Sequence, residues 1–278
     1  MLLPSGSTEL LALFGGALRS SPSPQTHTHW ARSCGLNLIY VPLTCASDLD
    51  FLQLANTLMN CPQFKGGNIT NPFKTAALRL EGIELAQSAQ VCGAGNTLHH
   101  NGQNWVLSNT DLAGCMQSIR TLLTPSPTSF EIITLGTGAM SRTVAVAFER
   151  VCSELKIELQ QSRVVSRAEL ESGTFGPLDG HRVERSVVVN TLPASTQVEA
   201  DARATHFLKA LQSTRVAETF ALFDLSYHET ETLKHARDNG WTVETGRQLF
   251  HVQARESFKL WTNIDLPSDS GVQWPSSE

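Results

Sequence analysis

No stretch of this sequence is apolar enough to cross a bilayer. A spanning helix needs roughly 20 apolar residues in succession, and none of the 278 residues lies in such a window. The apolar stretch from Leu10 to Phe14 is too short for a signal peptide, and no basic segment precedes it. We therefore expect a cytoplasmic protein with no membrane partner.

Neither sign of charge dominates. The chain has 21 Lys and Arg residues against 26 Asp and Glu residues, which gives a formal net charge of -5. These charges are scattered, so no basic stripe is present to follow a phosphate backbone. The sequence therefore predicts no nucleic-acid partner.

Metal-binding spacings are also missing. None of the six cysteines forms a Cys-x-x-Cys pair, so neither a zinc knuckle nor a redox dithiol is predicted. His27, His99 and His100 have no partner residues at the spacing of a metal site. We predict no metal.

The first half of the chain alternates strand-like and helix-like stretches. Apolar runs at Leu10–Phe14, Leu38–Val41 and Val106–Leu107 predict strands, and Ser47–Met59 predicts a helix. A Pro/Ser/Thr cluster at 124–128 is typical of a segment that joins two packed units. We expect a first α/β domain before this cluster.

The second half reads as a βαβ unit followed by more strands. Phe130–Leu135 predicts a strand, Met140–Glu154 a helix and Leu155–Gln160 a second strand. Ser186–Val189 and Phe220–Leu225 predict two further strands. Repeated strands with crossovers indicate a Rossmann-like, doubly wound parallel sheet.

A glycine turn, Gly136-Thr137-Gly138, joins the first of these strands to its helix. Gly136 suits a tight turn, and Gly138 lets phosphates approach the backbone at the helix N-terminus. The third glycine position of the dinucleotide pattern holds Ser141. A turn that serves packing alone remains the alternative.

The choice of cofactor is usually decided about 20 residues after such a turn. Glu158 lies at that distance and would favour NAD, but we place it inside a strand. Ser162 and Arg163 are expected at the tip beyond the strand, with Arg167 on the next helix. The two arginines favour NADP, unless they are ordinary solvated surface residues.

Several further motifs occur in one order along the chain, from near residue 14 to near residue 262. They are Ser21-Pro22-Ser23-Pro24 with His27, Gly66 to Lys74, Gly93 to Thr97, Asn109 to Gly114, Gly136 to Arg142, Ser162 to Ala168, Asn190-Thr191, Asp224 to Tyr227, Gly246 to Gln253, and Ser257-Phe258 with Leu260-Trp261. In identity and order they resemble the shikimate dehydrogenase family. The joint order carries this resemblance, because each motif alone is common.

The resemblance implies two domains with a cleft between them for substrate and nicotinamide. Residues 1–113, completed by 250–278, would form an α/β domain that binds substrate and performs catalysis. Residues 114–249 would form the NADP-binding Rossmann-like domain, and the C-terminal helix would return to the first domain. The implied reaction is the reversible reduction of 3-dehydroshikimate to shikimate by NADPH, on the route to chorismate and the aromatic amino acids.

The resemblance also implies a set of site residues. Lys74 would be the acid/base group and Asp111 its partner, a pair able to move a proton to a ketone oxygen. Residues with hydroxyl, phenol or amide groups would bind the substrate: Ser21, Ser23, Thr70, Asn96, Tyr227 and Gln253. The cofactor-binding residues would be Gly136, Gly138, Ala139, Ser162, Arg163, Arg167, Asn190, Thr191 and Gly246.

Four departures from the family pattern leave catalytic efficiency and ring specificity open: Thr28, Gly95, Leu192-Pro193 and Leu249. The nearest alternative is a relative that oxidises quinate or uses NAD. A non-catalytic ligand sensor with this fold and a Rossmann protein with an unrelated substrate are further alternatives. We expect a monomer or a homodimer with a small-molecule substrate.

Overall fold

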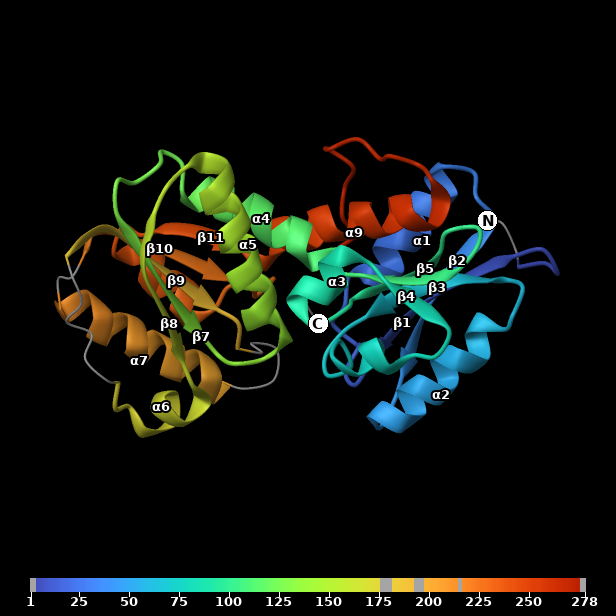
Figure 1. Ribbon diagram of the computed structural model, residues 1–278, viewed down its shortest axis with the longest axis horizontal. Helices are drawn as coiled ribbons and strands as arrows, with labels where there is room; N and C mark the ends of the chain where they lie inside the picture. Colours follow the sequence, from blue (N-terminus) through green and yellow to red (C-terminus); the bar gives the residue numbers. More distant parts are fainter. Residues whose placement is uncertain (1–3, 176–181, 193–197, 215–216, 276–278) are drawn as a thin grey trace. The chain divides into compact units, whose positions relative to one another are not determined.

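The computed structural model describes residues 4–175, 182–192, 198–214 and 217–275. The chain divides into a first unit, Met1–Asp111 with His251–Glu278, and a second unit, Leu112–Phe250. The Pro/Ser/Thr cluster at 124–128 therefore lies inside the second unit. Figure 1 shows that each unit is a sheet flanked by helices.

The first unit contains a sheet of six strands. Its elements are β1 (Glu9–Gly15), α1 (Ser23–Ser33), β2 (Leu38–Thr44), α2 (Asp48–Met59), β3 (Phe64–Ile69), the 3₁₀ turn η1 (Ala76–Arg79), β4 (Ile83–Leu85), α3 (Gln87–Cys92), β5 (Thr97–His100) and β6 (Trp105–Ser108). The strand order is β2-β1-β3-β5-β6-β4. β5 runs antiparallel to β3 and β6, whereas β1 is parallel to both its neighbours.

Both faces of this first sheet are covered. β1 alternates its side chains, as strands must, so Ala12 and Phe14 join a core cluster with Phe51 of α2 and Phe73. On the other face α1 packs with residues after 250, where Trp30 meets Phe258 edge to face. Burial on both faces explains why β1 reads as a continuous apolar run.

The second unit contains five parallel strands. Its elements are α4 (Asp111–Leu122), which starts at the last residue of the first unit, β7 (Phe130–Leu135), α5 (Ala139–Leu155), β8 (Leu159–Val165), α6 (Arg167–Ser172), β9 (Val183–Asn190), α7 (Val198–Thr214), β10 (Ala217–Asp224), α8 (Glu231–Asp238), β11 (Thr242–Thr245) and α9 (Gly246–Thr262), which ends in the first unit. The strand order is β11-β10-β9-β7-β8.

This order confirms the predicted α/β fold with a doubly wound parallel sheet. Buried side chains of α6, α7 and α8 form one core cluster with the sheet, and α5 lies on the opposite face from α7 (Figure 1). β7 has the predicted bounds, and α5 extends the predicted helix by one residue at each end. The predicted return of the last helix is also confirmed, because α9 residues after 250 belong to the first unit.

The strand predicted at Leu155–Gln160 is wrong. α5 continues to Leu155, and Lys156 ends it with a left-handed φ of 55°. The strand therefore starts only at Leu159, so Arg163 lies within β8 rather than at a tip beyond it. β8 is an edge strand with largely exposed polar residues, so it lacks the apolar pattern that would have marked its bounds.

Candidate active site

A buried ion pair joins Lys74 to Asp111 in the first unit. The distance from Lys74 Nζ to Asp111 Oδ2 is 2.7 Å, and the two side chains are only 15% and 7% exposed. Lys74 follows β3 in a segment anchored by a hydrogen bond from the backbone N–H of Gly95 to its carbonyl oxygen. Asp111 is the first residue of α4, where the helix dipole favours a carboxylate.

A network of buried polar side chains surrounds Asn96, just before β5. Asn96 Nδ2 donates to Thr110 Oγ1 at 3.0 Å and to Gln253 Oε1 at 3.4 Å. Asn96 Oδ1 accepts from the backbone N–H of Thr110 at 2.7 Å and from the hydroxyl of Thr97 at 3.1 Å. The amide of Asn96 thus directs all four of its hydrogen-bonding positions into the protein.

This arrangement orients the neighbouring amide of Gln253. Gln253 lies on α9, is 7% exposed, and has its Oε1 turned toward Asn96 Nδ2. Its Nε2 is then the atom that the side chain can offer to a ligand, as a hydrogen-bond donor. The structure therefore brings together four of the predicted residues as two neighbouring groups: Lys74 with Asp111, and Asn96 with Gln253.

The other predicted residues of the first unit lie before α1 and after β3. Ser21 and Ser23 form a group of their own, in which the backbone N–H of Ser23 donates to Ser21 Oγ at 3.3 Å. Ser23 begins α1 and is 5% exposed. Thr70 follows β3, and its backbone N–H donates to the carbonyl of Phe14 at 2.8 Å.

His27 lies in a buried aromatic cluster. Its ring stacks on Tyr40 with 4.7 Å between centroids and stands edge-on to Trp30 and Trp261. Complete burial lowers the pKa of His27 to about 3, so the ring is neutral at physiological pH. Its neighbour in sequence, Thr28, is half-buried on the same helix.

In the second unit, the glycine turn lies at the carboxyl end of β7. Gly136 has a φ of +104°, and a Cβ there would approach Thr191 Oγ1 to 2.7 Å, so the position requires glycine. Gly138 caps α5, whose first residue is Ala139, and a Cβ on Gly138 would meet open space. The turn therefore leaves room beside a helix N-terminus, which suits a phosphate group.

Two neighbouring strands end beside this turn. Asn190 at the end of β9 donates from Nδ2 to Asp224 Oδ2 at 2.9 Å, and Asp224 ends β10. Burial raises the pKa of Asp224. Thr191 donates to the carbonyl of Leu135 at 2.7 Å. The carboxyl ends of adjacent parallel strands, at the point where the strand order reverses, are the usual place for a nucleotide in such sheets.

Tyr227 and Gly246 lie after β10 and at the start of α9. A Cβ on Gly246 would lie 2.2 Å from the carbonyl oxygen of Leu225, so only glycine permits this close approach. The carbonyl of Tyr227 accepts from Arg247 Nε at 2.8 Å, and its ring meets Phe250 edge to face. Tyr227 thus belongs to the second unit, unlike the other predicted substrate residues.

The predicted phosphate-binding arginines form ion pairs with glutamates. Arg163 Nη2 lies 3.1 Å from Glu169 Oε1, and Arg167 Nε lies 2.7 Å from Glu171 Oε1. Ser162 precedes Arg163 in β8. The alternative cofactor residue, Glu158, lies before β8 begins and hence at the opposite end of the sheet from the glycine turn. Its position does not suit a ribose bound at that turn.

One of the four departures, Gly95, has a clear packing reason, and a second, Leu249, is buried. A Cβ on Gly95 would lie 2.4 Å from the side chain of Leu107, so a larger residue would displace that leucine. Leu249 is 6% exposed, and its carbonyl oxygen lies 2.6 Å from where a Cβ on Gly114 would stand. Pro193 lies outside the described residues.

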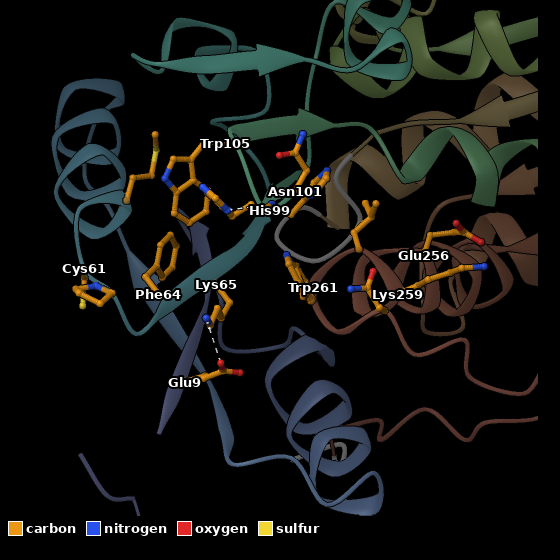
Figure 2. Close-up of a pocket in the computed structure, with 16 residues that line it drawn as sticks. Glu9, Cys61, Phe64, Lys65, His99, Asn101, Trp105, Glu256, Lys259 and Trp261 are labelled. Carbon is orange, nitrogen blue, oxygen red and sulfur yellow. Dashed lines mark hydrogen bonds and ion pairs between the residues drawn. The ribbon is translucent and has the colours of Figure 1, made fainter. Parts of the chain in front are cut away.

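A hollow of about 900 Å³ opens elsewhere on the first unit (Figure 2). Its lining includes aromatic and basic side chains, among them Phe64, Lys65, His99, Trp105, Lys259 and Trp261. None of the predicted site residues lines this hollow. It adjoins the start of β3, whereas Thr70 and Lys74 follow the end of that strand.

Nowhere in the described ranges do three or more His, Cys, Asp or Glu side chains gather in a way that could hold a metal ion. No helix in the same ranges has the length and apolarity to cross a membrane.

Several residues that complete these groups were given no site role from sequence, although three of them lie in the family motifs. Thr97 and Asp224 contact the predicted residues Asn96 and Asn190, and Ser257 contacts Thr97, but buried polar partners leave no periodic signal. Glu169 and Glu171 could have been found. Glu169 completes a capping box with Ser166, and Glu171 stands four residues after Arg167, the spacing of a helical ion pair.

The fold and these groups define a class of protein: an α/β protein that joins a nucleotide-binding type of sheet to a separate unit with a buried lysine–carboxylate pair. The chain is similar to the shikimate dehydrogenase family. Residues 13–98 match the family model described as the shikimate dehydrogenase substrate binding domain. The predicted resemblance to this family is confirmed.

Three relatives illustrate this similarity. A shikimate dehydrogenase (NADP(+)) from Carboxydothermus hydrogenoformans is 27% identical over 277 residues, covering 95% of each chain. A quinate dehydrogenase from Emericella nidulans is 24% identical, covering 97% of this chain and 92% of its own. The structure of shikimate 5-dehydrogenase from Thermus thermophilus in complex with NADP(H) and shikimate has a TM-score of 0.69 at 23% identity, covering 95% of this chain and 97% of its own.

Proposed function

We propose that this protein is an NADP-dependent shikimate dehydrogenase that reversibly reduces 3-dehydroshikimate to shikimate. The observation that carries this proposal is the 2.7 Å pair of Lys74 and Asp111, buried in a unit that matches the family's substrate-binding domain. The shikimate dehydrogenase (NADP(+)) relative, aligned over 95% of each chain, supports both the substrate and the cofactor.

Lys74 performs the proton transfer in this proposal. When NADPH is bound, its nicotinamide ring supplies the hydride for ketone reduction. The ammonium of Lys74 donates a proton to the ketone oxygen as charge develops there, and in the reverse direction its amine accepts the hydroxyl proton. Asp111, hydrogen-bonded to Lys74 Nζ, orients the ammonium and stabilises its charge.

Hydroxyl, phenol and amide side chains bind the ring acid. Ser21 and Ser23, adjacent at the start of α1, offer hydroxyl donors to the carboxylate. Thr70 and Tyr227 also donate hydrogen bonds, and Gln253 offers its amide Nε2. Asn96, whose amide is engaged within the protein, takes part chiefly by holding Gln253.

The carboxyl ends of β7, β8 and β9 hold the cofactor. Gly136, Gly138 and Ala139 place backbone N–H groups beside the pyrophosphate, and the open space at Gly138 fits this task. The 2′-phosphate-binding residues are Ser162, Arg163 and Arg167. Asn190, Thr191 and Gly246 shape the nicotinamide end.

A second candidate is oxidation of quinate or use of NAD. The quinate dehydrogenase relative from Emericella nidulans supports the substrate, and the engagement of both arginines by glutamates supports weaker selection of the 2′-phosphate. Initial rates with shikimate and quinate, each with NADP⁺ and NAD⁺, separate the candidates. The highest kcat/KM is expected for shikimate with NADP⁺. A higher value for quinate or NAD⁺ would favour the second candidate, and no turnover in any combination would favour a non-catalytic sensor.

The place of action that we propose is the cytoplasm, as a monomer or homodimer. All six cysteines are free thiols, which suits a reducing compartment. Sedimentation of the purified protein would test the oligomeric state.

A further inference from the structure

Three buried hydroxyl groups meet in the first unit, next to Asn96. Thr97 begins β5, Thr110 immediately precedes α4, and Ser257 lies on α9. Their oxygen atoms form a triangle with sides of 2.9 Å (Thr97 to Thr110), 3.0 Å (Thr110 to Ser257) and 2.9 Å (Thr97 to Ser257). Their exposed fractions are 0%, 6% and 0%. We call these three residues the hydroxyl triangle.

The hydroxyl triangle can give each of its three hydroxyl protons an acceptor. A hydroxyl donates one hydrogen bond and accepts two, so with the Thr97 proton directed to Asn96 Oδ1, Thr110 donates to Thr97 and Ser257 donates to Thr110. Further donors come from outside the triangle. Asn68 Nδ2 reaches Thr97 at 3.1 Å and Ser257 at 3.0 Å, and Asn96 Nδ2 reaches Thr110 at 3.0 Å.

Ser257 connects this triangle to the helix that carries Gln253. Gln253 and Ser257 are four residues apart on α9, so both face the same side of the helix. The next residue at this spacing, Trp261, donates from Nε1 to the carbonyl of Leu98 at 2.9 Å. Ser257 is therefore the contact that fixes the rotation of α9 at the turn adjoining Gln253.

We propose that Ser257 is a positioning residue for shikimate binding, acting through Gln253. Its hydroxyl holds the turn of α9 at which the Gln253 amide points Oε1 toward Asn96 and leaves Nε2 for the substrate. This inference rests on the proposed function, because it takes Gln253 to be a substrate ligand. The hydrogen bonds of Ser257 join it to Asn68, Thr97 and Thr110 rather than to Lys74 or Asp111.

The variant Ser257→Ala tests the inference and keeps the fold. Thr97 and Thr110 still pair with each other, and Asn68 Nδ2 still has Thr97 and the carbonyl of Asn96 at 3.2 Å. No buried donor is stranded. We expect the KM for shikimate to rise about fivefold to tenfold, the effect of one or two lost buried hydrogen bonds, with a smaller change in kcat and none in the KM for NADP⁺.

Ser118→Ala is the matched control. Ser118 is a fully buried serine on α4 whose hydroxyl has no hydrogen-bond partner among the described residues. Its replacement also removes a buried hydroxyl but does not touch the hydroxyl triangle. We expect unchanged kinetic constants for this variant.

A double-mutant cycle distinguishes positioning from a general loss of structure. If Ser257 acts through Gln253, Ser257→Ala raises KM in the wild type but adds less than twofold in a Gln253→Ala background. A rise in that background as large as in the wild type would overturn the inference, as would an unchanged KM in Ser257→Ala alone. Wild-type protein is assayed alongside, because absence of its turnover with shikimate would overturn the proposed function and this inference together.

Discussion

The two units hold the charges of their proposed functional residues in opposite ways. In the first unit, Lys74 and Asp111 form a buried pair with side chains 15% and 7% exposed. In the second unit, Arg167 and Glu171 form an exposed pair with side chains 69% and 43% exposed. The residues proposed for proton transfer are fixed before a ligand arrives, whereas those proposed for the 2′-phosphate are engaged by groups that a ligand can replace.

The difference follows from the surrounding solvent. The charges of a buried pair interact strongly. Removing one partner strongly destabilises the protein, because the other charge stays desolvated. An exposed pair is screened by water and salt and contributes little to stability. We therefore expect Lys74 and Asp111, the proton-transfer end, to be rigid and intolerant of substitution. The arginines Arg163 and Arg167 with their glutamate partners, the phosphate end, should tolerate substitution and exchange partners.

The largest expected effect is on Lys74. Lys74→Ala should lower kcat by about a hundredfold to ten-thousandfold, the usual contribution of a general acid or base. Lys65→Ala is the control, since Lys65 forms an exposed ion pair with Glu9 at 3.2 Å. Wild-type turnover by a folded Lys74→Ala protein would refute the assignment of the proton donor.

Next comes the pH dependence of stability at His27. Its pKa is lowered to about 3 in the folded protein, against 6.5 for the ordinary group. Between those values the unfolded chain binds the extra proton, so the free energy of unfolding falls as pH drops, by up to about 1.4 kcal/mol per pH unit. Above pH 6.5 the ring is neutral in both the folded and the unfolded protein, so the pH dependence due to His27 ends there.

His27→Phe keeps a ring against Tyr40 and cannot take up a proton. Urea unfolding at several pH values should show a shallower loss of stability between pH 6.5 and 3 in this variant than in the wild type. Equal slopes would mean that His27 is not buried as described.

A smaller effect is expected at the phosphate end. Arg163→Ala should weaken NADPH binding about tenfold, as loss of a charged hydrogen bond does, and leave NADH binding nearly unchanged. Titration of the nucleotide's fluorescence measures both affinities without substrate. An equal loss for NADH would show that Arg163 does not recognise the 2′-phosphate.

The smallest effect is a gain. Glu171→Gln should tighten NADPH binding about twofold to threefold, because the phosphate no longer competes with an exposed carboxylate for Arg167. High salt should reduce the gain. Glu154→Gln serves as the control, because Glu154 forms an exposed ion pair with Arg120 at 2.7 Å. Weaker NADPH binding by Glu171→Gln would reverse the interpretation of the phosphate end.

The second sheet shows how much of the fold could be predicted from sequence. β7 is apolar on both faces and ends in a glycine turn, and its bounds were predicted to the residue. β8 belongs to the same sheet but lies at its edge with polar residues exposed, and its predicted position was wrong. A strand buried on both faces has a continuous apolar run in its sequence, which marks its bounds. An edge strand with exposed polar residues has no such run.

The proposed site also contains residues that could be predicted from sequence and residues that could not. Family motifs identified Lys74 and Asp111, and the structure brings them within 2.7 Å of each other. Ser257 had no predicted role, because a serine in a helix has no distinctive local pattern and its partners are far away in sequence. Only the packing of α9 against β5 reveals the hydroxyl triangle.

The most direct test of the central claim is absorbance at the reduced-nicotinamide band after the protein is mixed with shikimate and NADP⁺. The account predicts a rise in absorbance at neutral to alkaline pH that requires both ligands and is lost in Lys74→Ala. No rise across this pH range, with protein that is folded, would contradict it.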